Sequence, residues 1–185
     1  MRPMAYVDFL FPESGDMAIP VMAGKVLGIF HRFCASTPGI YAMAFPHMGK
    51  SGDPSEIFET LRIFADTRDN LTTLVQNMKK EFLVRDYTAI SRPRVAPEKA
   101  DTWACFTRFR VPKEIRSERL NKMSRAYRYN LASTVPFLPC FSSSTQQHFR
   151  LYIERFTVKG PERSGGTLDS YGLSHNIDPL FLPVF

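Results

Sequence analysis

The chain contains no apolar run that approaches the ~20 residues of a membrane-spanning helix. Residues 1–4 lead directly into a predicted strand and lack the apolar core of a secretory signal. The three cysteines, Cys34, Cys105 and Cys140, are an odd number at wide spacing, which argues against a disulfide framework and a paired-cysteine zinc site. From these absences we expect a cytoplasmic protein with no membrane anchor.

Motifs for metal and nucleotide chemistry are also missing. No two histidines have the HxxxH spacing of a metal-binding helix, and no cysteine stands near a histidine at zinc-ligand spacing. The segment Gly49-Lys50-Ser51-Gly52 lacks the upstream glycine of a phosphate-binding loop, and paired carboxylates for two-metal catalysis are not visible. We therefore expect no metal and no cofactor, and a nuclease built on this chain would work without metal.

Positive charge is abundant but unevenly distributed. Residues 1–95 carry 11 Lys/Arg against 10 Asp/Glu, whereas residues 96–185 carry 13 against 8. The segment from Arg108 to Arg128 alone holds eight basic and two acidic residues. Charge concentrated in this way indicates a polyanionic partner, because a diffuse excess would serve only solubility. Nucleic acid is the leading partner class, and an anionic membrane or an acidic protein stays open.

The chain length fits one globular domain or two small ones, and the pattern of elements favours two. The first 96 residues predict the order β-α-β-β-α-β, which is the ferredoxin-like arrangement of the α+β class. The expected strands are residues 4–11, 40–45, 58–65 and 84–90, and the expected helices are residues 19–34 and 67–82. Because the charge balance changes at the same place, we expect one domain over residues 1–96 and a second over 97–185.

The second half predicts a more irregular set of elements. An aromatic strand over residues 102–111 is followed by a basic helix over about residues 113–129. A connector that holds Pro136 and Pro139 comes next, followed by a strand pair around residues 149–158 and a glycine-rich tail. We found no internal repeat.

The basic helix carries a row of cations at every third position. At 3.6 residues per turn such a row winds around the helix, so it suits a helix in a groove that has phosphates on both walls. Phosphate contacts of this kind give affinity and salt dependence with little sequence information. A solvated basic face is the alternative. The row consists of Lys113, Arg116, Arg119, Lys122, Arg125 and Arg128.

Two further arginines alternate along the strand that precedes this helix. Arg108 and Arg110 therefore point to one face of the strand. Two guanidinium groups on a rigid strand suit bidentate recognition of guanine O6 and N7. The alternative is a pair of surface arginines on an edge strand.

Histidine is the side chain best suited to move a proton near neutral pH, and His31 stands late in the first predicted helix. A histidine beside an apolar stripe is more often structural than catalytic, so both roles are open on this pattern. Metal-free RNA cleavage needs a base for the ribose 2′-OH, groups that hold this hydroxyl in line, and donors that stabilise developing charge. DNA lacks the 2′-OH, so such a site would cut RNA alone.

The C-terminal third resembles a known family. The segments that carry the resemblance are residues 142–153, Gly165-Gly166, residues 170–174 and Leu182-Pro183-Val184-Phe185. They resemble the CRISPR-associated endoribonucleases of subtype I-F, which process the repeat RNA. The resemblance extends to the helix with His31, to the end of the second strand and to the arginine strand before the basic helix, so it spans essentially the whole chain.

The resemblance implies an activity and a set of partners. Such enzymes bind the stem-loop of a CRISPR repeat, cut the precursor crRNA once at the 3′ base of the stem, and stay bound to the product. They need no metal, and other protein subunits of a type I-F surveillance complex are expected partners. The alternative is a non-catalytic subunit that binds the crRNA hairpin, and a DNA-binding or structural basic protein is a third reading.

The resemblance also implies roles for individual residues. His31 matches the general base, Ser142 matches the serine that orients the attacking 2′-OH, and Tyr171 matches a tyrosine near the active site. One departure concerns the second arginine of the strand, Arg110, because the best-known members have a glutamine there; the base that it contacts is therefore open. The remaining matches are Ser144 and Thr145 for the scissile phosphate, Phe149 for stacking on the closing base pair, and Arg108 for reading a guanine.

Overall fold

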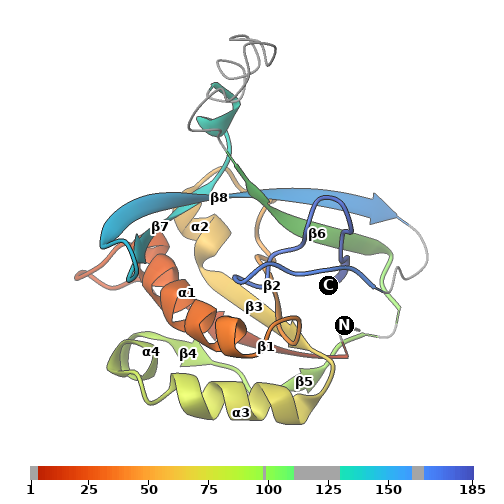
Figure 1. Cartoon of the computed structure of the whole chain (residues 1–185), viewed down its shortest axis with the longest axis horizontal. Helices are drawn as coiled ribbons and strands as arrows, with labels where there is room; N and C mark the ends of the chain where they lie inside the picture. The colour runs from red at the N-terminus through yellow and green to blue at the C-terminus, as the bar shows by residue number, and fades with distance from the viewer. Residues whose placement is uncertain (1–3, 98, 111–129, 160–164) are drawn as a thin grey trace.

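Two antiparallel sheets organise the computed structural model, which describes residues 4–97, 99–110, 130–159 and 165–185 (Figure 1). The α+β class expected from the sequence is confirmed. The first sheet contains β1 (Ala5–Leu10), β2 (Ala42–Ala44), β3 (Thr60–Ala65), β4 (Ala89–Ile90) and β5 (Arg94–Val95). The second contains β6 (Thr102–Phe109), β7 (Phe137–Ser142), β8 (Gln147–Lys159) and β9 (Leu182–Val184). The described helices are α1 (Ile19–Ser36), α2 (Pro54–Phe58), α3 (Arg68–Met78) and α4 (Phe82–Tyr87).

The first sheet has the strand order β2-β3-β1-β4, and β5 also pairs with β1. Val7 lies opposite Ile63 and Phe9 lies opposite Leu61, so these four fully buried side chains share one face of the sheet. α3 packs against β1 and β3. The second sheet has the order β7-β8-β6-β9, in which the long strand β8 pairs with both β7 and β6.

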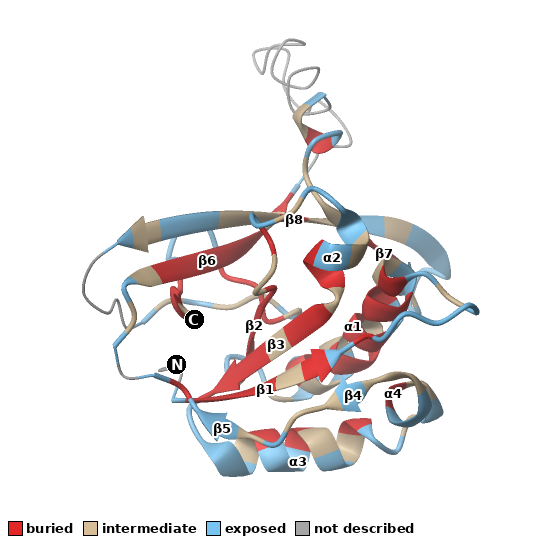
Figure 2. Cartoon of the chain, turned by 180° about the vertical axis from the view of Figure 1, so that it is seen from behind, coloured by how far each residue is buried: buried red, intermediate tan, exposed pale blue. Residues whose placement is uncertain are grey.

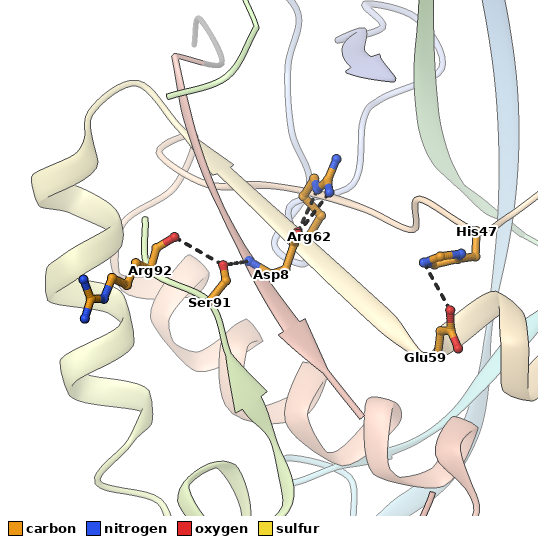
Figure 3. Close-up of polar contacts among 6 residues, drawn as sticks. All are labelled: Asp8, His47, Glu59, Arg62, Ser91 and Arg92. Atoms are coloured by element: carbon orange, nitrogen blue, oxygen red, sulfur yellow. Dashed lines mark hydrogen bonds and ion pairs between the residues drawn. The ribbon is translucent and has the colours of Figure 1, made fainter. Parts of the chain in front are cut away.

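The other face of the first sheet carries a polar pair among aromatic rings. The Arg62 guanidinium donates to both carboxylate oxygens of Asp8 across the neighbouring strand, at 2.7 and 3.0 Å (Figure 3). The same guanidinium lies 4.6 Å from the ring centre of Tyr6 and 4.3 Å from that of Phe185. Both charged side chains of this bidentate pair are largely buried. Through its contact with the Phe185 ring, the Arg62 guanidinium joins Phe185 to the first sheet.

Figure 3 also shows two contacts made by segments that flank strands of the first sheet. The Ser91 hydroxyl accepts a hydrogen bond from the backbone N–H of Asp8 at 3.0 Å and so ties the segment after β4 to β1. His47 Nε2 lies 3.2 Å from Glu59 Oε1, beside the start of β3. Both contacts hold a neighbouring segment against a strand of the first sheet, and this structural role accounts for them.

α1 connects the two sheets. It has Pro20 in its first turn, where the missing N–H costs little, and its buried side packs closely against β7. A Cβ atom added at Gly24 would overlap the carbonyl oxygen of Pro139, so glycine is what allows the helix to approach the strand. Figure 2 shows the buried residues concentrated in α1, β3 and β6, whereas much of β8 is exposed. One apolar cluster includes residues of both sheets.

The expected division into residues 1–96 and 97–185 falls between the two sheets. β5 ends at Val95, and β6 begins at Thr102. The apolar cluster nevertheless continues across this boundary. Whether the two halves fold as separate domains stays a prediction.

The structure corrects two expected strands in the first half. Residues 84–87 belong to the short helix α4, and only Ala89–Ile90 form a strand. The spacing of Leu83, Val84 and Tyr87 suits one side of a helix as well as it suits an irregular strand. Phe58 ends α2 and does not begin β3. This helix starts at Pro54, where Asp53 caps it by accepting a hydrogen bond from the backbone N–H of Ser55.

Two expectations for the second half are also corrected. Pro139 is part of β7 and not of a connector. β7 is an edge strand, where the missing N–H of proline leaves no partner strand unsatisfied. Residues 147–159 form one long strand and not a strand pair.

The six cations of the basic row lie outside the described residues. In the described segments, no helix has both the length and the apolar character needed to cross a bilayer.

Candidate functional site

His31 lies on the fourth turn of α1 and makes one short hydrogen bond. Its Nδ1 atom lies 2.6 Å from the backbone carbonyl oxygen of Ser170, which is distant in the sequence. A carbonyl oxygen can only accept, so this bond requires the proton to be on Nδ1. In the neutral ring Nε2 is then the unprotonated nitrogen, which can accept a proton.

Tyr171 stacks on the imidazole of His31. The two ring centres are 4.1 Å apart, and the ring planes differ by 11°. Burial raises the pKa of the Tyr171 phenol, and Cys140 and Asp169 raise it further, whereas the Arg108 cation opposes this shift; the pKa lies above its usual value, so the phenol is uncharged near neutral pH. The stacked ring therefore restricts the rotation of His31 without adding a charge.

Arg108 and Phe149 lie beside this pair. The guanidinium carbon of Arg108 is 5.8 Å from the Tyr171 ring centre and 5.9 Å from that of Phe149. Cys140 lies directly opposite Phe149 in the β7–β8 pairing, and Arg108 lies opposite Ile153 in the β6–β8 pairing. Because β8 residues 149 and 153 share one face, Arg108, Phe149 and Cys140 all point to the same face of the second sheet.

Cys140 is buried on that face. Burial raises the pKa of its thiol to about 12, while the Arg108 cation favours the thiolate and opposes this shift. Ser142 stands two residues further along β7, on the same face and about 6.6 Å away along the strand. The register therefore places the Ser142 side chain on the side of the sheet that carries Arg108 and Phe149.

Ser142 ends β7 and begins the tight turn to β8. Its hydroxyl lies 3.1 Å from that of Ser144 and 3.3 Å from the backbone N–H of Thr145. Gln146 completes the turn with a φ of 54°, and Ser144 and Thr145 are exposed. The turn thus groups four hydroxyl residues, Ser142, Ser143, Ser144 and Thr145, at one end of the second sheet.

The structure brings the predicted residues together in two groups. His31, Tyr171, Arg108 and Phe149 form one continuous set of neighbours. The hydroxyl residues of the β7–β8 turn form the other, and the hydrogen bonds described for Ser142 lie within this turn. Arg110 follows β6 and is exposed. The roles of all these residues stay predictions.

Sequence reasoning missed the backbone partner of His31 and the turn that presents it. Ser170 acts through its carbonyl oxygen, which no residue type reveals. A signal was nevertheless available, because Asp169-Ser170-Tyr171-Gly172 has the aspartate and glycine of a tight turn. Gly172 has a φ of 75°, and a Cβ there would come within 2.9 Å of the Tyr41 carbonyl oxygen.

The described residues contain no group of three or more His, Cys, Asp and Glu side chains arranged to hold a metal ion. What they do contain is an imidazole in one tautomer near a guanidinium cation, which is suited to general acid–base chemistry on an anionic substrate.

Comparison with protein families identifies the group to which the chain belongs. The family described as CRISPR-associated protein (Cas_Csy4) matches residues 6–185. The chain therefore belongs to this family, the CRISPR-associated endoribonucleases of subtype I-F. It is a CRISPR-associated protein of precursor-crRNA processing, and its family membership implies binding of CRISPR repeat RNA. No curated protein sequence matches the chain.

Proposed function

We propose that the chain is a metal-independent endoribonuclease that recognises both the structure and the sequence of the CRISPR repeat stem-loop. It cleaves the precursor crRNA at the 3′ base of the stem and stays bound to the mature crRNA, in a surveillance complex with other type I-F subunits. The observation that supports this most directly is the short bond between His31 Nδ1 and the Ser170 carbonyl. This bond leaves Nε2 available as a base.

In the proposed reaction, His31 Nε2 takes the proton of the 2′-OH immediately upstream of the cut. The 2′ oxygen attacks the adjacent phosphorus, the bond to the 5′ oxygen breaks, and the departing 5′ oxygen takes up a proton from water, so a 2′,3′-cyclic phosphate and a 5′-hydroxyl result. Ser142 orients the attacking hydroxyl, and Tyr171 holds the His31 ring. Ser144 and Thr145 contact the phosphate at the scissile bond, where donors stabilise the developing charge.

Binding of the stem relies on other residues. Phe149 stacks on the base pair that closes the stem, Arg108 reads a guanine, and Arg110 contacts a second base. The basic helix lines the groove of the stem through the row of residues 113–128. We also propose that residues 1–96 form a ferredoxin-like domain, which the order β2-β3-β1-β4 of its antiparallel strands supports.

A single-atom change in the substrate tests the reaction. A repeat hairpin with 2′-deoxyribose at the nucleotide upstream of the cut should bind normally and resist cleavage, because the nucleophile is missing. The unmodified hairpin should be cut equally well in EDTA and yield a 2′,3′-cyclic phosphate. Cleavage of the deoxy substrate, or a requirement for Mg²⁺, would contradict the mechanism. Binding of the unmodified hairpin without any product would instead identify a non-catalytic hairpin-binding subunit.

The role of Arg108 in base recognition can be tested separately. Arg108→Ala should weaken binding of the cognate stem by about 1–3 kcal/mol, and it should weaken binding much less when the contacted guanine is swapped. Affinities for both stems can be measured by filter binding at one fixed salt concentration. Arg150→Ala is a matched control, because Arg150 points to the opposite face of the same sheet and lies over Phe137. Equal losses of affinity for both stems would show that Arg108 contacts a phosphate and does not read a base.

A further inference from the structure

Ser170 and Tyr171, the two residues that contact His31, lie in a turn that is closed by a single carboxylate. Asp169 Oδ1 accepts hydrogen bonds from the backbone N–H of Tyr171 at 2.9 Å and from that of Leu173 at 3.0 Å. Two backbone bonds reinforce the turn: Gly172 N–H donates to the Asp169 carbonyl, and Asp169 N–H donates to the Leu173 carbonyl. We refer to residues 169–173 as the Asp169 turn.

The Asp169 turn is attached to both sheets. The Gly172 carbonyl accepts from the backbone N–H of Met43 in β2 at 2.9 Å. Ser174, directly after the turn, donates its N–H to the Phe106 carbonyl in β6 at 2.8 Å. These two bonds fix the C-terminal end of the turn, and the bond from the Asp169 N–H to the Leu173 carbonyl ties its start to that end. The carboxylate of Asp169 then determines the path of the backbone in between.

From these contacts we infer that Asp169 is a positioning residue for the proposed cleavage reaction and acts through the Ser170 carbonyl and the Tyr171 ring. The inference rests on the proposed function of His31 as the base. The Asp169 side chain accepts from the N–H of Tyr171, which belongs to the same peptide unit as the Ser170 carbonyl, and from the N–H of Leu173, so it orients the peptide unit that carries this carbonyl and the one that follows Gly172. One carboxylate oxygen thus controls both contacts of the imidazole, namely its hydrogen bond and its stacking partner.

The physical consequence concerns the tautomer of His31. The Ser170 carbonyl stabilises the form with the proton on Nδ1, because only that form can donate to it. When the turn loses its closing acceptor, the carbonyl moves, and the form with the proton on Nε2 gains population. That form cannot accept the proton of the 2′-OH through Nε2. The role of Asp169 requires a hydrogen-bond acceptor at its side chain and does not require its negative charge.

A pair of substitutions separates the acceptor from the charge. Asp169→Ala removes both, whereas Asp169→Asn keeps the oxygen that accepts the two N–H groups. Under single-turnover conditions with saturating protein, Asp169→Ala should slow cleavage on the order of 10–100-fold, as expected for a displaced catalytic group. Hairpin affinity should stay within about threefold, because the charges that hold the stem are unchanged. Asp169→Asn should cleave within about threefold of the original chain, since its acceptor oxygen is retained.

A spectroscopic measurement tests the inference without reference to cleavage. In ¹⁵N-histidine spectra, with the His31 signal assigned by its loss in His31→Ala, the original chain and Asp169→Asn should show the Nδ1–H tautomer. Asp169→Ala should show a mixture. Asp53→Ala is the matched control, because Asp53 also caps a backbone N–H, at 2.8 Å, but at the start of α2. It should change neither the tautomer nor the cleavage rate.

Three outcomes would overturn the inference: an unchanged rate in Asp169→Ala, an unchanged tautomer in Asp169→Ala, or a loss in Asp169→Asn as large as that in Asp169→Ala. If Asp169→Ala does not fold, Asp169→Asn still decides, because a loss of more than tenfold in that folded variant contradicts an acceptor role. The proposed function fails on a different result, namely efficient cleavage by His31→Ala. The two failures are therefore distinguishable.

Discussion

Replacing His31 by alanine is expected to lower the rate of repeat-RNA cleavage by about 10²–10⁴-fold, the usual contribution of a general base. The imidazole is the only group that this substitution removes from the site. Hairpin affinity should stay within a few-fold, because the residues proposed to bind the stem, namely the basic row of residues 113–128, Arg108 and Phe149, are unchanged. The measurement is a single-turnover time course beside a filter-binding titration of the same hairpin.

His175→Ala is the matched control for this experiment. His175 is exposed, and its described hydrogen bonds use only its backbone atoms. It should cleave like the original chain. Ser142→Ala should slow cleavage for a different reason, because the nucleophile loses its orienting hydroxyl while the base remains. A His31→Ala variant that cleaves at the original rate would remove the imidazole from the mechanism.

A second large effect is expected in the helix that carries His31. Gly24→Ala should lower the free energy of unfolding by about 1–3 kcal/mol, the usual cost of overpacking. The added Cβ would overlap the carbonyl oxygen of Pro139, which is a backbone atom and cannot rotate away. The helix must therefore move from β7. Urea unfolding followed by circular dichroism measures the change.

Gly28 provides an opposite prediction one turn further along α1. A Cβ atom there would meet nothing within 4 Å, so Gly28→Ala should raise the free energy of unfolding by about 0.5–1 kcal/mol through helix propensity.

Gly24→Ala should also slow cleavage, because α1 carries His31 and β7 leads to Ser142. If both alanine variants were stabilised equally, the close approach of α1 to β7 would be wrong.

The sequence was most informative where side-chain chemistry carried the signal. The strand β1 and the start of α3 near residue 67 were predictable, since both depend on local pattern. His31, Tyr171, Arg108 and Phe149 were identified as candidates from chemistry and resemblance, and the structure places them next to one another.

The features that the sequence did not reveal depend on backbone atoms or on tertiary contacts. The carbonyl of Ser170 has no residue-type signature, and Asp169 is one of many acidic residues until its N–H partners are known. Pro139 indicates a loop in isolation, and only its place on an edge strand explains it. Residues 84–87 satisfied two periodicities, and local pattern alone cannot choose between them.

The three buried cysteines can be used to measure how often the structure around them opens. Burial raises the pKa of Cys34 and of Cys140 to about 12, so at neutral pH their thiols are almost entirely protonated and shielded from alkylating reagents. Alkylation then requires the surrounding structure to open, and its rate measures the free energy of that opening. Cys140 belongs to the strand that packs against α1, so its alkylation, located by peptide mass spectrometry, reports how often this contact separates.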